Sequence, residues 1–234
     1  WIDLTGLPPE PDDVRRYLED SGAEAWDKAV DRLLASPQFG ERSAQSWLDA
    51  ARYSDTTGYA ADKPREMWVY RQWVIEALNA DMPFDQFTIE QLAGDMLPGS
   101  TASQKVASGF HRNSMQALGN NPRKEEFRVK GVVDRVNTTG RVWLGTSLEC
   151  AECHDHKYDP FSQRDYYRVF ALFNNIPHYG EGYGVYGPRM KVPLPGQQAS
   201  LDALSTRETF LKELEVRRLR ELADVSYDPE KARG

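Results

Sequence analysis

Apolar residues recur at every third or fourth position through most of this 234-residue chain, and this spacing predicts a mainly helical fold. The segments with this pattern begin after a proline-rich turn and cover residues 14–18, 26–34, 41–53, 68–78, 86–92, 104–110, 125–144, 165–173 and 206–223. No segment alternates apolar and polar residues over the length of a strand. We therefore expect a mainly α protein, an irregular multi-helix domain with long loops and little or no sheet.

Two interruptions divide the pattern. Thr138, Thr139 and Gly140 break the longest periodic segment, so we expect a bend there. After residue 176 the composition changes to glycine, proline and tyrosine, which is typical of an irregular loop. We therefore expect one helical domain over residues 1–176, followed over 177–234 by a loop and a charged helix.

Composition excludes some classes of protein. The net charge is -7, and nucleic-acid binding generally requires a basic surface. No apolar run approaches the roughly 20 residues that span a bilayer, so no transmembrane segment is expected here. The chain starts at Trp1 and Ile2 as if within a longer sequence, so we interpret it as a fragment of a larger precursor.

The strongest chemical signal is Cys150-Ala151-Glu152-Cys153-His154, which contains both cysteines of the chain. C-x-x-C-H is the attachment pattern of c-type haem, in which the thiols bond the two vinyl groups and the histidine ligates the iron. The motif thus predicts a covalent haem on Cys150 and Cys153, with His154 as the proximal ligand. It also predicts a redox protein that is exported, either periplasmic or on the cell surface.

Other ligand sets remain open at this motif. Cys150, Cys153, His154 and His156 could together bind zinc, although zinc sites usually draw their ligand pairs from separate segments. A redox-active or structural C-x-x-C pair is a further alternative. Asp155 and Asp159 could bind Ca²⁺, which prefers carboxylate oxygens, or Asp159 could cap the next segment.

The opposite side of a haem iron needs either a second ligand or an open position. Met115 is a candidate ligand, and His156 is another metal-binding candidate. His156 is so close to His154 in sequence that we expect it to contact a propionate or another partner instead. His111, His178 and Met190 are further candidates. Arg128 and Arg135, seven positions apart and so on one helix face, could pair with the propionates or else with solvent or Asp134.

The residues also resemble a known family. The similarity lies in Gly145–Pro160 with Asp165–Tyr167 and Phe170–Asn175, and in the segments Leu4–Pro9, Asp31–Pro37, Trp68–Ile75, Asp81–Phe87, Gln91–Asp95 and Val133–Thr139. Over about residues 4–176 the chain resembles the planctomycete-type cytochrome-associated domain, a domain of unknown function. It departs from that family at Gln116–Pro122, which lacks the acidic pair usual there.

This resemblance implies an exported, multidomain redox protein whose partners are other cytochrome or redox domains of the same polypeptide. We therefore expect a haem-binding domain that transfers electrons. A haem enzyme with an open distal site, a zinc hydrolase, and a structural or carbohydrate-binding module are the rival interpretations.

Overall fold

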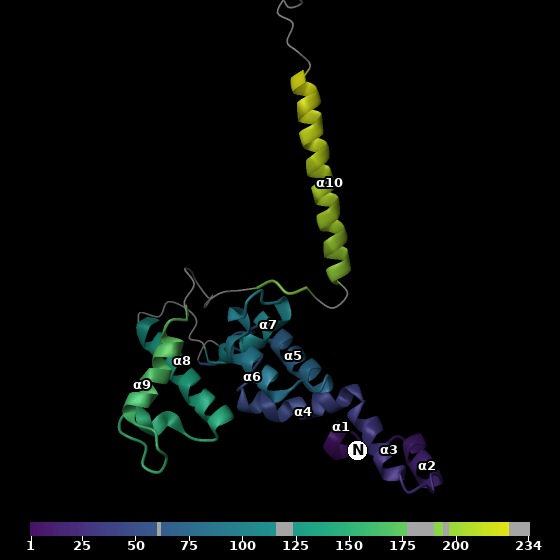
Figure 1. The fold of residues 1–234 in the computed structure, drawn as a ribbon, viewed down its shortest axis with the longest axis vertical. Helices are drawn as coiled ribbons and strands as arrows, with labels where there is room; N and C mark the ends of the chain where they lie inside the picture. Colours follow the sequence, from purple (N-terminus) through teal and green to yellow (C-terminus); the bar gives the residue numbers. More distant parts are fainter. Residues whose placement is uncertain (60–61, 116–123, 177–189, 194–196, 225–234) are drawn as a thin grey trace, which may run out of the picture. The chain divides into compact units, whose positions relative to one another are not determined.

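The computed structural model describes residues 1–59, 62–115, 124–176, 190–193 and 197–224 (Figure 1). Within these ranges the regular structure is helical, and one isolated β-bridge joins Thr56 to Pro64. The α-helices are α1 (Ile2–Thr5), α2 (Pro11–Glu19), α3 (Ala25–Leu34), α4 (Pro37–Ala50), α5 (Trp68–Asn79), α6 (Phe84–Ala93), α7 (Ala102–Ala107), α8 (Lys124–Thr139), α9 (Gln163–Asn174) and α10 (Gln197–Asp224). Short turns are η1 (Gly94–Met96), η2 (Ser108–Arg112), η3 (Gly140–Leu144) and η4 (Leu148–Glu152). The prediction of a mainly α fold is confirmed.

The chain forms two compact units, Trp1–Arg189 and Met190–Gly234. The first contains α1–α9, and the second contains α10. The expected boundary after residue 176 borders residues 177–189, which lie outside the described ranges. Among the described helices, none combines the length and the apolar character that crossing a bilayer would require.

A buried glutamine holds the aromatic core of α4, α5 and α6 together. Oε1 of Gln91 accepts hydrogen bonds from Trp47 Nε1 and from the Tyr70 hydroxyl, both at 2.8 Å. Trp73 stacks on Phe87 with ring centroids 5.4 Å apart. Because Gln91 is fully buried, these bonds satisfy an amide that would otherwise destabilise the core.

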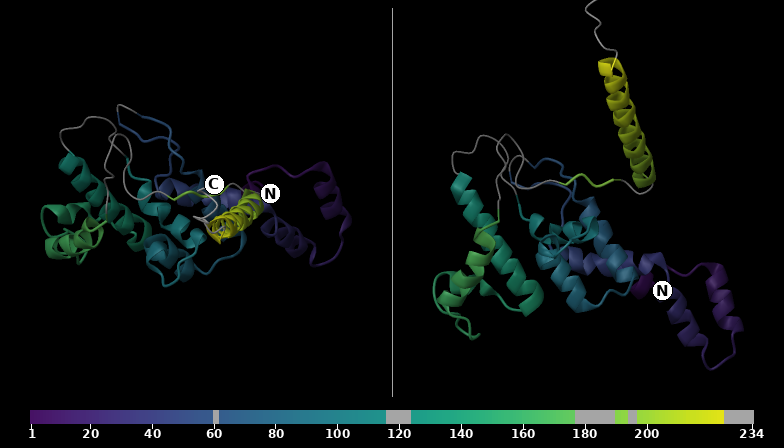
Figure 2. Two further views of the ribbon diagram at one scale, coloured as in Figure 1. Left: turned by 90° about the horizontal axis from the view of Figure 1, so that it is seen from above. Right: turned by 45° about the horizontal axis from the view of Figure 1, so that its top comes forward.

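A second apolar cluster lies between α8 and α9, which run side by side in Figures 1 and 2. Its fully buried members are Val136 of α8, Tyr166 of α9, and Leu148 and Ala151 of η4. The cysteine motif is therefore built on a turn that is anchored in the core.

Gly140 permits this anchoring. At Gly140 the α-helix widens into the π-helical turn η3, where the sequence predicts a bend, and the turn ends at Gly145 with φ of +62°. A Cβ on Gly140 would lie 2.7 Å from Cγ of Leu148, closer than real Cβ contacts. A glycine is thus required for Leu148 to pack against η3.

Gly140→Ala should therefore lower the free energy of unfolding by about 1–3 kcal/mol, the usual effect of overpacking a core. Arg141→Ala is the control, since it alters the adjacent exposed residue and should cost under about 1 kcal/mol. Urea unfolding followed by circular dichroism measures both. Equal effects of the two variants would show that Gly140 does not hold Leu148 in place.

Candidate functional site

The side chains of the turn η4 point in three directions, because a 3₁₀-helix repeats every three residues. Leu148 and Ala151 share the face that enters the core, where they are 3% and 0% exposed. Glu149 and Glu152 share a second face, which lines a surface groove. Cys150 shares the third face with Cys153, the residue that caps the turn, and both are free, exposed thiols.

The imidazole of His154 is held in one tautomer. Its Nδ1 lies 2.8 Å from the backbone oxygen of Asp155. A carbonyl oxygen can only accept, so Nδ1 must carry the proton and the neutral ring keeps its lone pair on Nε2. Histidines that ligate metals are commonly oriented by this kind of bond from the other ring nitrogen.

His156 has the opposite arrangement. Its Nδ1 accepts hydrogen bonds from the backbone N–H groups of Tyr158 (3.3 Å) and Asp159 (2.8 Å), so the proton of the neutral ring lies on Nε2. The side chain is 8% exposed, and its backbone N–H donates to Phe161 at 2.8 Å. The lone pair of Nδ1 is engaged by these two N–H groups and Nε2 carries the proton, so neither nitrogen is available to a metal in this arrangement. The ring instead closes the loop from 156 to 161.

The two aspartates of the expected Ca²⁺ site also stabilise this loop. Oδ1 of Asp155 accepts from the Gln163 N–H at 2.8 Å, at the start of α9, and Oδ2 of Asp159 accepts from the Thr146 hydroxyl at 2.5 Å. Among the described residues, no three His, Cys, Asp or Glu side chains are gathered as for a metal ion. The four residues expected for zinc thus do not form a ready ligand set, and zinc and calcium both remain untested predictions.

A groove of about 550 Å³ lies between α8 and the glutamate face of η4. Carboxylates outnumber basic side chains along it, and Val129 and Val133 add apolar surface. The charged side chains along it are Glu125, Glu126, Lys130, Asp134, Arg141, Glu149 and Glu152. Because carboxylates are in excess here, they would repel the anionic propionates of a haem bound in this groove.

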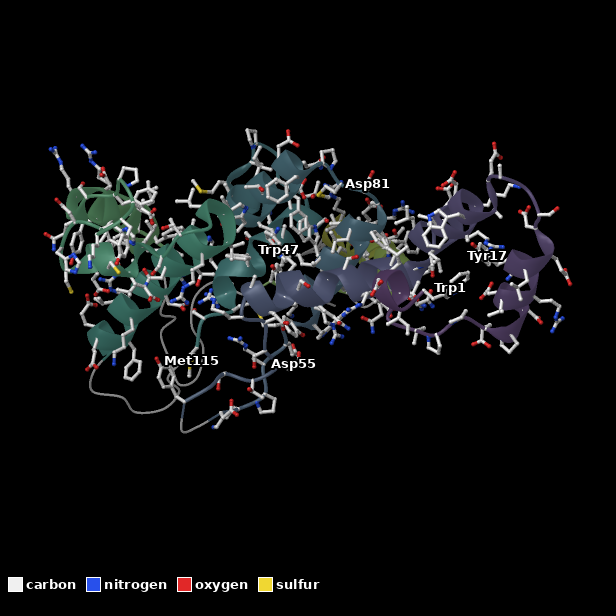
Figure 3. All side chains as sticks on the ribbon, turned by 90° about the horizontal axis from the view of Figure 1, so that it is seen from below. Trp1, Tyr17, Trp47, Asp55, Asp81 and Met115 are labelled. Carbon is white, nitrogen blue, oxygen red and sulfur yellow. The ribbon has the colours of Figure 1, made fainter. Side chains whose placement is uncertain are left out.

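The candidates for the second iron ligand come from several parts of the chain. Met115 is 56% exposed and lies against Gly58, near the loop that carries Asp55 (Figure 3). Met190 belongs to the second unit, and His178 lies outside the described residues. The role of Met115 as a distal ligand therefore remains a prediction for which this structure gives no supporting contact.

The two arginines expected at the propionates have protein partners. Arg128 donates to both carboxylate oxygens of Glu125, at 2.8 and 2.7 Å, and to Oδ1 of Asn174 at 2.6 Å. Arg135 is 1% exposed, and its Nε donates to the backbone oxygen of His111 at 3.3 Å. The two arginines lie on one side of α8, as expected. Arg135, however, points into the protein, so a propionate could contact it only by entering the core.

A family model described as "PSCyt2: Protein of unknown function (DUF1549)" matches residues 1–178. The chain belongs to this family. A search of curated proteins gave no match, and neither did a search of solved structures. The matched range includes the segments on which the resemblance to a cytochrome-associated domain was based. The family description names no reaction, so membership of the PSCyt2 family does not identify a chemistry for this domain.

The PSCyt2 domain also contains a buried histidine that the sequence offered only as an iron ligand. His111 is 6% exposed, and its ring lies between Phe110 and Phe173, with centroids 5.0 and 4.7 Å away. No described residue forms a hydrogen bond with either ring nitrogen. Burial, with the charges of Arg135 and Arg52, lowers the pKa of His111 to about 3, so the ring is neutral at pH 7. Its helix-end position gave no signal of this burial.

His156 and His154 should differ in their effect on stability. His156→Ala leaves two backbone donors of the loop without an acceptor and should lower the free energy of unfolding by about 1–3 kcal/mol. His154→Ala is the matched control and should cost less than about 0.5 kcal/mol, because His154 is exposed. Urea unfolding of the haem-free chain measures both. His156→Asn should recover part of the loss, since its Oδ1 can accept; equal losses in the two alanine variants would refute the assigned roles.

His111 should make stability depend on pH. Between its folded pKa of about 3 and its ordinary value of 6.5, the unfolded chain binds a proton that the folded chain does not. Stability should therefore fall as pH drops below 6.5, by up to about 1.4 kcal/mol per pH unit. His111→Phe should remove this part of the slope. Urea unfolding at pH 7.5 and 5.0 tests this, and parallel slopes in the two proteins would contradict the buried neutral ring.

Proposed function

We propose that this PSCyt2 domain carries one covalent haem c on Cys150 and Cys153, with His154 as an iron ligand. The observation that carries the proposal is the tautomer of His154, whose Nε2 lone pair is available next to two exposed, free thiols. The donor set therefore fits the chemistry of haem attachment. When bound, the haem would supply a centre for one-electron transfer at its iron.

Electron transfer is favoured over catalysis by the place of the motif. The thiols and His154 lie exposed on η4 and just after it, whereas an enzyme needs a cavity that encloses its substrate. The groove beside η4 is open, and carboxylates outnumber basic side chains along it. An exposed attachment site suits close approach by another redox domain, and we infer that such partners belong to the same exported polypeptide.

The proposal predicts covalent haem after expression with a c-type cytochrome maturation system. The wild-type chain should keep one haem through denaturing electrophoresis and give a pyridine haemochrome spectrum. Replacing both cysteines by alanine should abolish this signal, because both thioether bonds are lost. His154→Ala should shift the Soret band of the folded protein by changing the axial ligand, whereas His156→Ala, the control, should leave the band unchanged.

Three results would refute the proposal. They are the absence of haem from folded wild-type protein, an unchanged Soret band in His154→Ala, and stoichiometric zinc in metal analysis of the purified chain. The last of these would favour the zinc alternative at the same residues.

A further inference from the structure

Four arginines converge where the end of α4, the loop before α5, η2 and α8 meet. They are Arg52, Arg65, Arg112 and Arg135. Arg65 donates to the backbone oxygens of Arg112, Asn113 and Ser114, at 3.3, 3.1 and 2.9 Å. Burial lowers the pKa values of Arg65 and Arg135, and the neighbouring charges of Arg52 and Arg112 lower them further. The cluster is thus a concentration of positive charge in a protein whose net charge is -7.

Two described carboxylates act on Arg52 and Arg65. Asp134 of α8 pairs with Nη1 of Arg52, and Asp55 acts on Arg65 from the loop before α5. Clustered arginine charge favours an anion, and the attraction is stronger inside the protein than it would be in water.

One edge of the Arg52 guanidinium has no hydrogen-bond partner among the described residues. Its Nε and Nη2 are buried, and no described residue accepts a hydrogen bond from them. These two nitrogens lie on the same edge and form a planar fork, the geometry that binds two oxygens of one anion. The backbone holds Arg52 here at a φ of +58°, in the left-handed region that favours glycine.

Neighbouring side chains add further unpartnered groups. The Ser114 hydroxyl is buried and lacks a hydrogen-bond partner among the described residues, as do both ring nitrogens of His111. The neutral His111 ring has one N–H to donate, and the charges of Arg52 and Arg135 act on it. Folded proteins pair most buried polar groups, so several unpaired groups in one charged cluster indicate a missing ligand.

We propose that the Arg52 fork, in the cluster that also contains His111 and Ser114, binds a small tetrahedral oxyanion, phosphate or sulfate, either free or as an ester. Arg112 and Arg135 contribute positive charge. This site is independent of the proposed haem, since it uses none of the residues of the cysteine motif.

The test is calorimetric titration of the haem-free chain in chloride solutions of constant ionic strength. Three ligands are compared, namely inorganic phosphate, inorganic sulfate and glycerol 2-phosphate, so that free ions are distinguished from an ester. At least one should bind, and it should raise the melting temperature. Arg52→Gln should weaken binding roughly tenfold or more through loss of the bidentate, charge-assisted pair. Arg52→Lys keeps the charge without the fork and should also bind weakly.

Arg141→Gln is the matched control, because it removes the same charge from a surface pair with Glu149. It should change the affinity less than twofold, as expected for a distant, screened charge. Circular dichroism verifies that each variant is folded; if Arg52→Gln fails to fold, Arg52→Lys carries the comparison. The proposal is overturned if none of the three anions binds more tightly than chloride, or if Arg141→Gln weakens binding as much as Arg52→Lys does.

Discussion

The packing of Leu148 and Ala151 between α8 and α9 determines how the cysteine motif is displayed. These two residues are almost fully buried, and the three-residue repeat of η4 then fixes the direction of every other residue in the turn. The thiols are exposed because their neighbours are anchored. The anchoring itself depends on Gly140, whose missing side chain makes room for Leu148. A short apolar contact in the core thus sets the geometry of the reactive surface.

The two histidines of the motif show what sequence alone can establish. The C-x-x-C-H pattern predicted His154 as the proximal iron ligand, and it left His156 as a metal candidate expected to contact a propionate. The structure separates them through backbone hydrogen bonds: His154 donates to a carbonyl, whereas His156 accepts from two N–H groups. Such bonds depend on how the loop from 156 to 161 closes, and a pattern of residues does not encode that closure directly. The tautomer of each ring was therefore not predictable from the sequence.

The helices were easier to predict from the sequence than the roles of the histidines, because a helical spacing of apolar residues extends over many positions. The predicted segments correspond to α2–α10, and the interruption at Thr138–Gly140 marks the change from α8 to η3. Pro37, just past α3, begins α4, because proline is tolerated in the first turn of a helix. The shorter elements α1 and η4 were missed, since four or five residues carry too little periodicity. The burial of Arg135 was missed because charge normally predicts exposure.

Successive residues of α8 contact different parts of the domain. Asp134 pairs with Arg52, Arg135 reaches the carbonyl of His111, and Val136 packs with Leu148 of the cysteine turn. The buried charge of Arg135 costs stability on α8 itself, whereas the positive φ of Arg52 costs stability just after α4. Because Val136 is fully buried, α8 cannot shift at Asp134 without disturbing the contact that anchors η4. An anion that neutralises the arginine cluster would reduce the charge repulsion around Arg135, on the helix whose Val136 packs against the cysteine turn.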